Sequence, residues 1–488
     1  MKFCTNLQFL ASIVATVLLP LVSGCFSLGP DFEEPKWDGP EAWPGAAPVA
    51  SPLPDGAPWW SVFGDPVLDA LEAELLEQNP SLAAAVARLD AAAAQLGITR
   101  SGLAPSAAVS ASATYDRQSG EAHGSNNLED NPAWLYSTGV AFSWELDFWG
   151  RVRRKVEAAS ADVASSMQDV LNSRRILAAQ LATSYITLRT LQSRLDYAHR
   201  NVNLQSNTLE IVRARREARL CGDLDVRQAE MNLAATRANI PSLEANVDST
   251  LNSICTLLGR YPGTKEELRV PAPVPLPDDA ALPATLPADL LRNRPDIAAA
   301  IENFHSAVAS IGAAKAEFLP KVSLDGSFAF TATGADNLFK PNARNYSFGP
   351  TIEWPIFTAG RLYNQVLEAE ASARAAEAEF REAVLSAAAE CETALSSRRH
   401  AVAALGDLRA AARAAEEAAD LAESLYRSGL TDFENVLDMQ RELASNRDNL
   451  AQGIGSAASA LVDVWQAFAG PVAQRPTESH KPQTTNKK

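Results

Sequence analysis

The chain has 488 residues, enough for two or three ordinary domains, and 47% of them are hydrophobic while only 7% are aromatic. Its formal net charge of −16 disfavours a nucleic-acid partner, because phosphate binding requires a basic surface. The five histidines have no paired ligand spacing, and Cys221, Cys255 and Cys391 match neither a disulfide framework nor a zinc site. With no phosphate-binding loop or nucleophile motif in the sequence either, we predict no enzymatic activity, no metal site and no cofactor.

The first 25 residues have the features of a bacterial lipoprotein signal. Lys2 precedes an apolar run over residues 9–22 that is too short for a transmembrane helix. Two small residues then stand directly before Cys25, as in a lipobox, which implies removal of residues 1–24 and lipidation of Cys25. In lipoproteins, a residue other than Asp after the cysteine favours delivery to the outer membrane, and here it is Phe26. The alternative is an ordinary signal peptide followed by an incidental cysteine.

Two long parts of the chain resemble each other. Residues 79–106 align with residues 294–321 at an offset of 215, and FSWELDFWGRVRRK from Phe142 aligns with IEWPIFTAGRLYNQ from Ile352 at an offset of 210. The difference of five residues falls where a hairpin loop would change length. A duplication explains these matches. It divides the chain into a proline-rich N-terminal segment 25–64, a first repeat 65–258, a proline-rich linker 259–287, a second repeat 288–470 and a disordered tail 471–488.

Each repeat is predicted to contain a helix, a β-hairpin, a very long helix, a turn and a return helix. Between residues 151 and 218 there is neither proline nor glycine, and between 361 and 428 only Gly406 interrupts the pattern. Helices of this length would be roughly 100 Å long, and their alanine-rich four-three spacing is typical of a coiled coil. The expected elements are helices at about 66–103, 151–218, 223–258, 288–318, 361–428 and 432–469, with hairpins at about 105–149 and 320–359.

The hairpin segments alternate between apolar and polar residues with a period of two, which is typical of a strand with one apolar and one polar face. A soluble β-sandwich has the same pattern, but nothing nearby offers a second sheet. We therefore expect membrane strands whose aromatic side chains contact lipid rather than bind a ligand. These side chains are Phe328, Phe330, Tyr346, Phe348 and Trp354.

Four strands cannot close a membrane barrel, because about eight is the smallest number observed and open edges in lipid leave backbone groups unpaired. Copies of the chain must therefore pool their strands, and three copies give twelve, which is wide enough for a lumen. The pairs Gly150–Arg151 and Gly360–Arg361 mark the points where a strand becomes a periplasmic helix, with each arginine near the lipid headgroups. A plain helix start explains the same residues without any lipid contact.

Several motifs together resemble one family. They are LVSGC (21–25), GPDFEEP (29–35), the tryptophan-rich segment 59–82, the two strand–Gly-Arg–helix junctions, and the turns LCGDLDVRQAE (220–230) and SGLTDFENVLDMQRELA (428–444). On these motifs, residues 25–470 resemble the TolC/OprM-like outer-membrane factors of tripartite efflux pumps, in their lipoprotein (NodT-type) branch. The resemblance implies a mostly α-helical trimer with a shared twelve-stranded membrane β-barrel, a periplasmic α-helical barrel and an equatorial belt of the proline-rich segments.

The resemblance also implies a function and partners. The trimer would be a passive exit duct in the outer membrane, supplied by an inner-membrane RND-type transporter and opened by a periplasmic adaptor protein. The transporter could export drugs or metals, or belong to a one-component protein secretion system, and the sequence does not encode the substrate. The residues alone leave two other classes of protein possible. One is a periplasmic coiled-coil lipoprotein without a barrel, and the other is an enzyme tethered by its lipid.

In this family the two turns form the tip that meets the adaptor, here around Gly222, Gly429 and Leu430. Arg219 stands where the first turn usually has glycine, so we expect the backbone to turn elsewhere, with Gly222 available three residues later. That substitution leaves the geometry of the first turn open.

The family's gate lies just past these turns. Asp438 matches one of two gate aspartates, and Asn435 occupies the other position. Three copies of Asp438 would form an acidic constriction that attracts cations, although an aspartate near a helix start is also favourable to the helix dipole by itself. Asp225 and Tyr426 match family positions whose hydrogen bonding helps to hold the gate shut.

Overall fold

The computed structural model describes residues 27–35, 57–116, 133–277 and 294–469. The signal peptide, Cys25, most of both proline-rich segments and the tail lie outside these residues. The predicted fold class is confirmed, because long helices accompany a single four-stranded antiparallel sheet in the described chain. Two compact units are present, one within residues 1–36, 88–167 and 299–381, the other within 37–87, 168–298 and 382–488. Each unit therefore contains parts of both sequence repeats.

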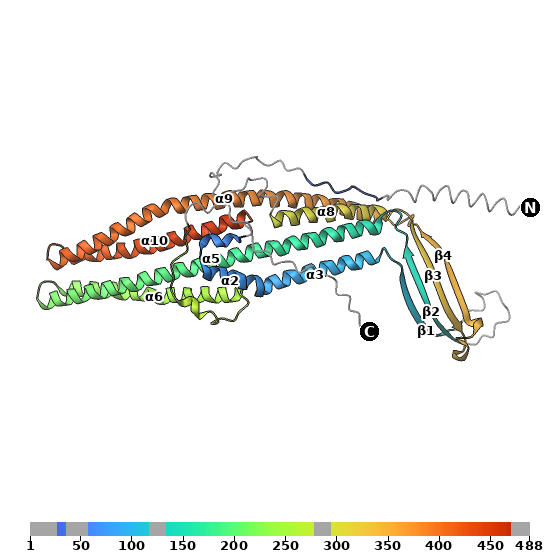
Figure 1. Cartoon of the computed structure of the whole chain (residues 1–488), viewed down its shortest axis with the longest axis horizontal. Coiled ribbons are helices and arrows are strands. Elements are labelled where there is room, and N and C mark those ends of the chain that lie inside the picture. The colour runs from blue at the N-terminus through green and yellow to red at the C-terminus, as the bar shows by residue number, and fades with distance from the viewer. Residues whose placement is uncertain (1–26, 36–56, 117–132, 278–293, 470–488) are drawn as a thin grey trace, which may run out of the picture. The chain divides into compact units, whose positions relative to one another are not determined.

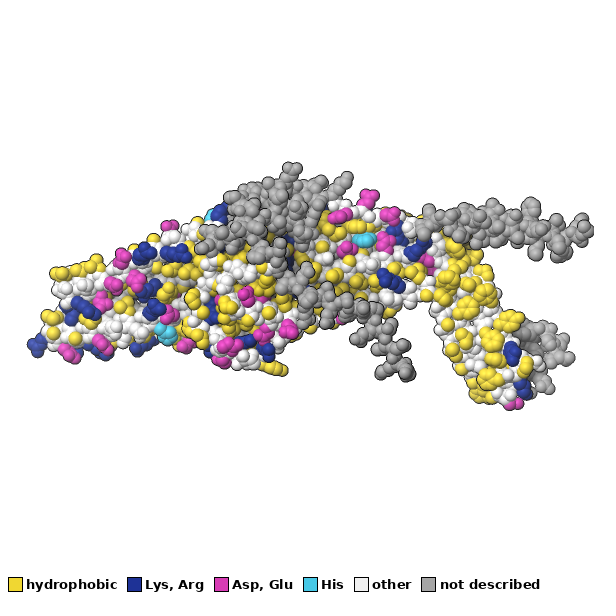
Figure 2. All heavy atoms as spheres, in the orientation of Figure 1, with side chains coloured by type: hydrophobic (Ala, Val, Ile, Leu, Met, Phe, Trp, Pro, Cys, Tyr) yellow, Lys and Arg dark blue, Asp and Glu magenta, His cyan; other side chains and the backbone are white. Residues whose placement is uncertain are grey.

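The first unit contains the sheet, in the strand order β1-β2-β3-β4 (Figure 1). Directly paired residues share a face, so the register places polar Ser143, Asp325 and Ser347 on one face and apolar Phe142, Phe328 and Phe348 on the other. Figure 2 shows hydrophobic side chains gathered over these strands. The strands are β1 (Ser106–Asp116), β2 (Ala133–Glu145), β3 (Lys321–Ala332) and β4 (Arg344–Glu353).

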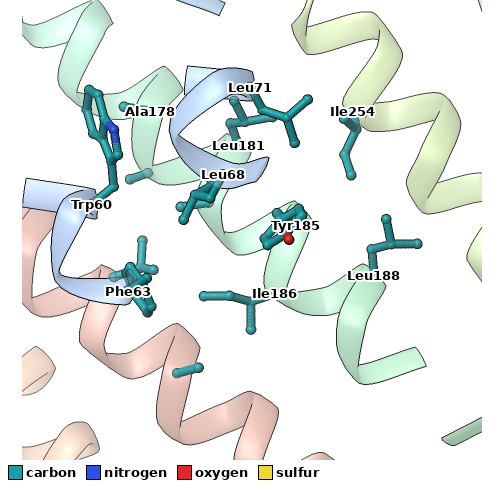
Figure 3. Packing of buried hydrophobic residues seen from close by; sticks show 14 of the residues in the cluster. Trp60, Phe63, Leu68, Leu71, Ala178, Leu181, Tyr185, Ile186, Leu188 and Ile254 are labelled. Carbon is teal, nitrogen blue, oxygen red and sulfur yellow. The ribbon is translucent and has the colours of Figure 1, made fainter. Parts of the chain in front are cut away.

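The second unit is built around the tryptophan-rich segment before α2 (Pro66–Gln78). Trp59, Trp60 and Phe63 in the 3₁₀ helix η1 (Trp59–Phe63) are buried, and the cluster continues through α2 onto the long helix α5 (Arg151–Glu217). Figure 3 shows Leu68 and Leu71 of α2 facing Leu181 of α5. Burying a leucine side chain is worth about 1.5–3 kcal/mol, so this cluster is the main core of the unit.

The predicted helix 66–103 is wrong as a single element. The structure has two helices, α2 and α3 (Pro80–Ser101), because Asn79 between them is extended at φ −65° and ψ 122°. Pro80 disfavours helical geometry in the residue before it, and the Asn79 side chain accepts a hydrogen bond from the Leu82 amide at 2.9 Å. Residues 66–101 are apolar enough to cross a membrane by length and composition, but Asn79 divides them.

The two very long helices each have 67 residues, α5 and α9 (Arg361–Arg427). Within the second unit, α6 (Asp223–Leu257) follows α5 and α10 (Phe433–Ala467) follows α9, and each runs back beside its predecessor (Figure 1). Ion pairs join each couple, Arg213 with Glu230 and Arg447 with Glu416. The remaining helix, α8 (Pro295–Ala316), is shorter than the predicted 288–318, of which the first part lies outside the described residues.

Two buried arginines secure the C-terminal end of α10. Arg294 donates to the Ala467 carbonyl at 2.6 Å and to Glu390 at 2.7 Å, and Arg175 donates to the Gln466 carbonyl at 2.7 Å. Both lie beside Asp296, and although burial opposes ionisation, the Arg294 guanidinium keeps the pKa of this carboxyl below its usual value. Cations at a helix C-terminus satisfy its free carbonyls and oppose its dipole, so this cluster fixes where α10 ends.

Candidate functional site

The two turns that connect α5 to α6 and α9 to α10 are held together by one apolar cluster. It combines residues from four helices, α5, α6, α9 and α10, so both repeats contribute to it. Its buried members are Leu209, Val212, Ala229, Leu233, Ala422, Tyr426, Phe433, Val436 and Leu437. We refer to this cluster and the two turns above it as the tip.

In the second turn, α9 ends as the sequence predicts. Gly429 has a φ of +72°, and the Leu430 amide donates back to the Leu425 carbonyl at 2.9 Å. A left-handed residue followed by such a bond is the Schellman ending, which favours glycine because no Cβ crowds the backbone. Gly429 is therefore the turning residue, and Leu430 beyond it has 75% of its surface exposed.

The first turn has the same geometry without the glycine. Arg219 has a φ of +59°, and the Leu220 amide donates to the Arg215 carbonyl at 2.8 Å. The expectation that the backbone turns elsewhere is thus wrong, since Gly222 lies at φ −89° and is the N-cap of α6. A left-handed non-glycine residue costs about 1–2 kcal/mol, which the Schellman bonds and the packing of the tip must offset.

Tyr426 is the centre of the tip. Its ring lies 5.3 Å from the ring of Phe433 and 4.6 Å beneath the guanidinium carbon of Arg215. The same guanidinium donates to the carbonyls of Tyr426 at 2.7 Å and Arg427 at 3.1 Å, the last residues of α9. Arg215 from the first repeat thereby caps the helix of the second repeat, a contact that no local sequence pattern predicts.

The hydroxyl of Tyr426 is buried and is not hydrogen-bonded to Asp225 within the described chain. Burial chiefly raises the pKa of Tyr426, and the nearby Cys221 thiol and Asp225 carboxylate raise it further because they disfavour a phenolate. The fold thus brings Asp225 close to Tyr426, as the family positions imply. Within one protomer, however, the two side chains form no hydrogen bond. Cys221 is half-buried and packs against the cluster, while Cys255 and Cys391 are buried.

Asn435 and Asp438 lie on the face of α10 that points away from the cluster. Both are exposed, three residues apart, while Val436 and Leu437 between them are buried. Asn435 donates to the Thr431 hydroxyl at 2.8 Å, and Asp438 lies 3.5 Å from Arg441 one turn along the helix. One helical face therefore presents an amide and a carboxylate to whatever lies beside the tip.

In the first unit, the two strand–helix junctions share their backbone but differ in their ion pairs. Gly150 and Gly360 both have positive φ, +75° and +84°. Arg151 donates to Glu145 and Glu317 and is half-buried, whereas Arg361 is exposed and donates to Gln365 at 3.1 Å. Arg151 is therefore held by two carboxylates, whereas Arg361 forms no ion pair with the residues that the structure describes.

The junctions also share an indole contact. Nε1 of Trp144 donates to the Leu103 carbonyl at 3.0 Å, and Nε1 of Trp354 donates to the Phe318 carbonyl at 3.0 Å. Each indole ties the end of a strand to the end of the helix that precedes its hairpin. The exposed Trp354 side chain thus has a structural role besides its predicted lipid contact.

Residues 27–35 dock beside the first junction. The Arg154 guanidinium donates to the Leu28 carbonyl at 3.1 Å and to Asp31 at 2.6 Å, and Phe32 stacks on His305 with centroids 4.5 Å apart. Gly29 and Gly312 make the closest approach, because a Cβ on Gly312 would lie 2.4 Å from the Leu28 carbonyl oxygen. The segment that follows Cys25 therefore packs against a complementary surface. We refer to this surface, formed by Arg154, His305 and Gly312, as the seat of residues 27–35.

Comparisons with known proteins cover nearly the whole chain. The family model described as outer membrane efflux protein matches residues 71–260 and 286–470. Nodulation protein T of Rhizobium leguminosarum bv. viciae is 30% identical over 96% of both chains, and outer membrane protein OprJ of Pseudomonas aeruginosa is 30% identical over 94% of this chain and 95% of its own. The solved outer-membrane channel OprN superposes with a TM-score of 0.82 at 32% identity, over 91% of this chain and 99% of that one. The similarity thus includes both repeats.

Proposed function

Since the chain belongs to the outer membrane efflux protein family, we propose that three copies of it form the exit duct of a tripartite efflux pump. The protein is an outer membrane efflux component and not an enzyme. Its sheet supports sharing between copies, because β1 and β4 each have only one neighbour among the described strands. Edges left open in lipid would expose unpaired backbone groups at several kcal/mol each.

The partners at the tip are an adaptor and, through it, an inner-membrane RND-type transporter. Three leucines at the turns support an apolar docking surface, because Leu220, Leu224 and Leu430 are 65–75% exposed. Exposed leucines gathered at one end of four packed helices favour a partner that covers them. Gly222, Gly429 and Leu430 would therefore contact the adaptor.

The gate would be formed by the outward face of α10. Three copies of Asp438 around a threefold axis would place three carboxylates at the pore, with Asn435 one turn closer to the turn. Arg215 and Tyr426 would hold the turns in the closed position, and Asp225 would act on Tyr426 through its charge. The cargo of such a duct would be drugs or other small toxic compounds selected mainly by the transporter.

The lipid on Cys25 would tether the chain at the seat of residues 27–35. Ser27 follows Cys25 by two residues, and the seat lies at the junction where β2 becomes α5. No bound cofactor is needed for this role. The lipid would thus enter the membrane beside the barrel rather than at a distance from it.

The unpaired edges β1 and β4 are the observation that carries the proposal, and insertion into a membrane tests it. Purified protein should migrate as a heat-modifiable trimer and produce discrete conductance steps in a planar bilayer. A soluble monomer that yields no conductance would contradict it. Deletion of the gene should increase sensitivity to a panel of toxic compounds, and the compounds affected would identify the cargo.

A further inference from the structure

The two hairpins have the same register, residue for residue. In the first hairpin Ser106 of β1 pairs with Ser143 of β2, and in the second Lys321 of β3 pairs with Glu353 of β4. The offset of 215 carries Ser106 to Lys321, and the offset of 210 carries Ser143 to Glu353. The offset of 215 came from the helices before the hairpins, and the offset of 210 came from the strand ends and the junctions after them. The pairing of the remaining strand residues agrees with both offsets, so the repeat is a repeat of structure.

The same equivalence holds for side-chain contacts next to the strands. Trp144 bonds the Leu103 carbonyl and Trp354 bonds the Phe318 carbonyl, at the same distance. The tryptophans differ by 210 and the carbonyls by 215. This indole contact in one repeat therefore has a counterpart in the other.

Among the described strands, one pairing joins the two repeats, and the other two lie within a repeat. Strand β2 pairs with β3, and in this ladder Ser143 lies opposite Asp325. The equivalents of β2 and β3 are β4 and β1, which are the two open edges of the sheet. These edges cannot reach each other within one four-stranded sheet, so the counterpart of the β2–β3 ladder must involve a second copy of the chain.

We propose that β4 of one copy pairs antiparallel with β1 of the next copy in the register that places Glu353 opposite Ser110. The register follows from carrying Ser143 to Glu353 and Asp325 to Ser110 by the two offsets. It rests on the proposed trimeric duct, for which it specifies the seam between copies. In the same ladder Thr351 lies opposite Ser112 and Ile352 opposite Ala111.

The side chains on both faces of the sheet fit this register. In the β2–β3 ladder, the Ser143 hydroxyl donates to the Asp325 carboxylate at 2.6 Å. At the seam the carboxylate is on Glu353 and the hydroxyl on Ser110, so the same kind of pair forms with the strands exchanged. On the apolar face the register places Phe348 opposite Tyr115, and in the single chain these rings are 69% and 59% exposed.

Other registers match the side chains of β4 and β1 less well. A slip of one residue would move the polar face of one strand onto the apolar face of its neighbour, because side chains alternate along a strand. A slip of two residues keeps the faces but places Glu353 opposite Ala108 or Ser112, and it breaks the equivalence of the two ladders. The two-residue slips are therefore the alternatives that an experiment must separate.

Disulfide cross-linking measures the register directly. Residues directly opposite in an antiparallel pair have Cα atoms about 4.5–5.5 Å apart, within disulfide range, while diagonal neighbours are about 7–8 Å apart. The double variant T351C/S112C is in register, and T351C/S110C and T351C/T114C are shifted by two residues either way. A second in-register pair, I352C/A111C, is needed because hydrogen-bonded and non-hydrogen-bonded pairs alternate along the ladder.

Each variant would be oxidised in isolated outer membranes and run on a non-reducing gel. We expect covalent trimers from at least one in-register pair, at more than ten times the yield of either shifted pair. The single variants, which keep the half-buried native Cys221, measure the background. A higher yield from a shifted pair, or no cross-link from either in-register pair in a protein that is still trimeric, would overturn the register. A wild-type chain that forms no trimer would instead overturn the proposed duct.

Discussion

Arg215 from the first repeat lies 4.6 Å over the ring of Tyr426 from the second and donates to the carbonyls of Tyr426 and Arg427. Hydrogen bonds to a charged group are worth about 1.5–3 kcal/mol each, and a cation–π contact adds about 0.5–1 kcal/mol at a partly exposed site. This one side chain therefore makes three favourable contacts that link the two turns of the tip.

Replacing Arg215 with alanine should loosen the closed tip. We expect the Arg215→Ala trimer to be open at least about tenfold more often in planar bilayers, since 1.4 kcal/mol corresponds to a factor of ten. Arg227→Ala is the matched control, because Arg227 is 80% exposed and pairs only with Glu230 on its own helix. Equal open probability in Arg215→Ala and Arg227→Ala would show that the contact does not hold the tip.

The charge on the outward face of α10 should set the ion preference of the duct. We expect Asp438→Asn to reduce cation selectivity and Asn435→Asp to increase it, because these changes remove and add a ring of three carboxylates. The reversal potential under a salt gradient measures both changes. If neither variant shifts the reversal potential, α10 does not face the narrowest part of the pore.

How far the sequence predicts this structure depends on the range of the interactions. The strand ends and long helices followed from local patterns, such as the glycine–arginine pairs and the absence of helix breakers before Glu217. The break at Asn79 was also visible as an Asn-Pro dipeptide, which favours a turn. The left-handed turn at Arg219 differs from the prediction, because the Schellman bond and the packing of the tip outweigh the local preference for glycine.

The contacts that no local pattern predicts are those between the repeats. Arg215 and Tyr426 are 211 residues apart, and nothing near either residue specifies the other. Their contact depends on which helices pack together, which is a property of the assembled bundle. Sequence alone therefore identifies the candidate gate residues on α10 more readily than the side chain that holds the turns.

The buried cluster at the end of α10 should contribute strongly to stability. Arg294→Ala would leave Asp296 and Glu390 without their main partner and the Ala467 carbonyl with only the weak Cys391 thiol as a side-chain donor in the described chain. Removing one partner from a fully buried pair costs about 3–5 kcal/mol. The cost here is smaller, because the Asp296 and Glu390 side chains are 28% and 42% exposed, and we expect the trimers to dissociate at a lower temperature. Arg381→Ala, which removes a mostly exposed i,i+4 pair with Glu377, should leave that temperature nearly unchanged. Similar effects from both variants would contradict this assignment.

Glu72 should make the second unit less stable as the pH rises. Its carboxyl is fully buried with neither oxygen hydrogen-bonded in the described chain, and burial raises its pKa well above the usual value, with the Asp69 carboxylate adding to the shift. The folded state therefore holds this proton more tightly than the unfolded state does. The stability from this group is complete below the unfolded pKa and is lost as the pH rises towards the folded pKa.

Substituting this residue tests the sign of the effect. Glu72→Gln cannot ionise, so we expect this variant to be more stable than the wild type near neutral pH. The stability of the wild type should fall between acidic and neutral pH, and in the variant this fall should be absent. Unfolding temperature measured across that range provides the comparison. A parallel pH dependence in both proteins would show that Glu72 is not the group responsible.

Gly97 and Gly312 occupy equivalent positions in the two repeats, and the same substitution should have opposite effects on them. A Cβ on Gly97 of α3 meets no atom within 4 Å, whereas a Cβ on Gly312 of α8 would lie 2.4 Å from the Leu28 carbonyl oxygen and 2.9 Å from the Arg154 side chain. Alanine is about 0.5–1 kcal/mol better than glycine inside a helix, so Gly97→Ala should stabilise the protomer slightly.

Gly312→Ala must instead displace residues 27–35 from their seat, because the nearest atom is backbone and cannot rotate away. We expect a protease to cut this segment at least several times faster in Gly312→Ala than in the wild type or in Gly97→Ala, while trimers still form from the barrel strands. Equal cleavage rates in the three proteins would mean that Gly312 does not hold the seat. Since alanine is the better helix former at both positions, a difference in sign would come from the atoms that crowd Gly312, the Leu28 backbone of the docked segment and the Arg154 side chain that binds it.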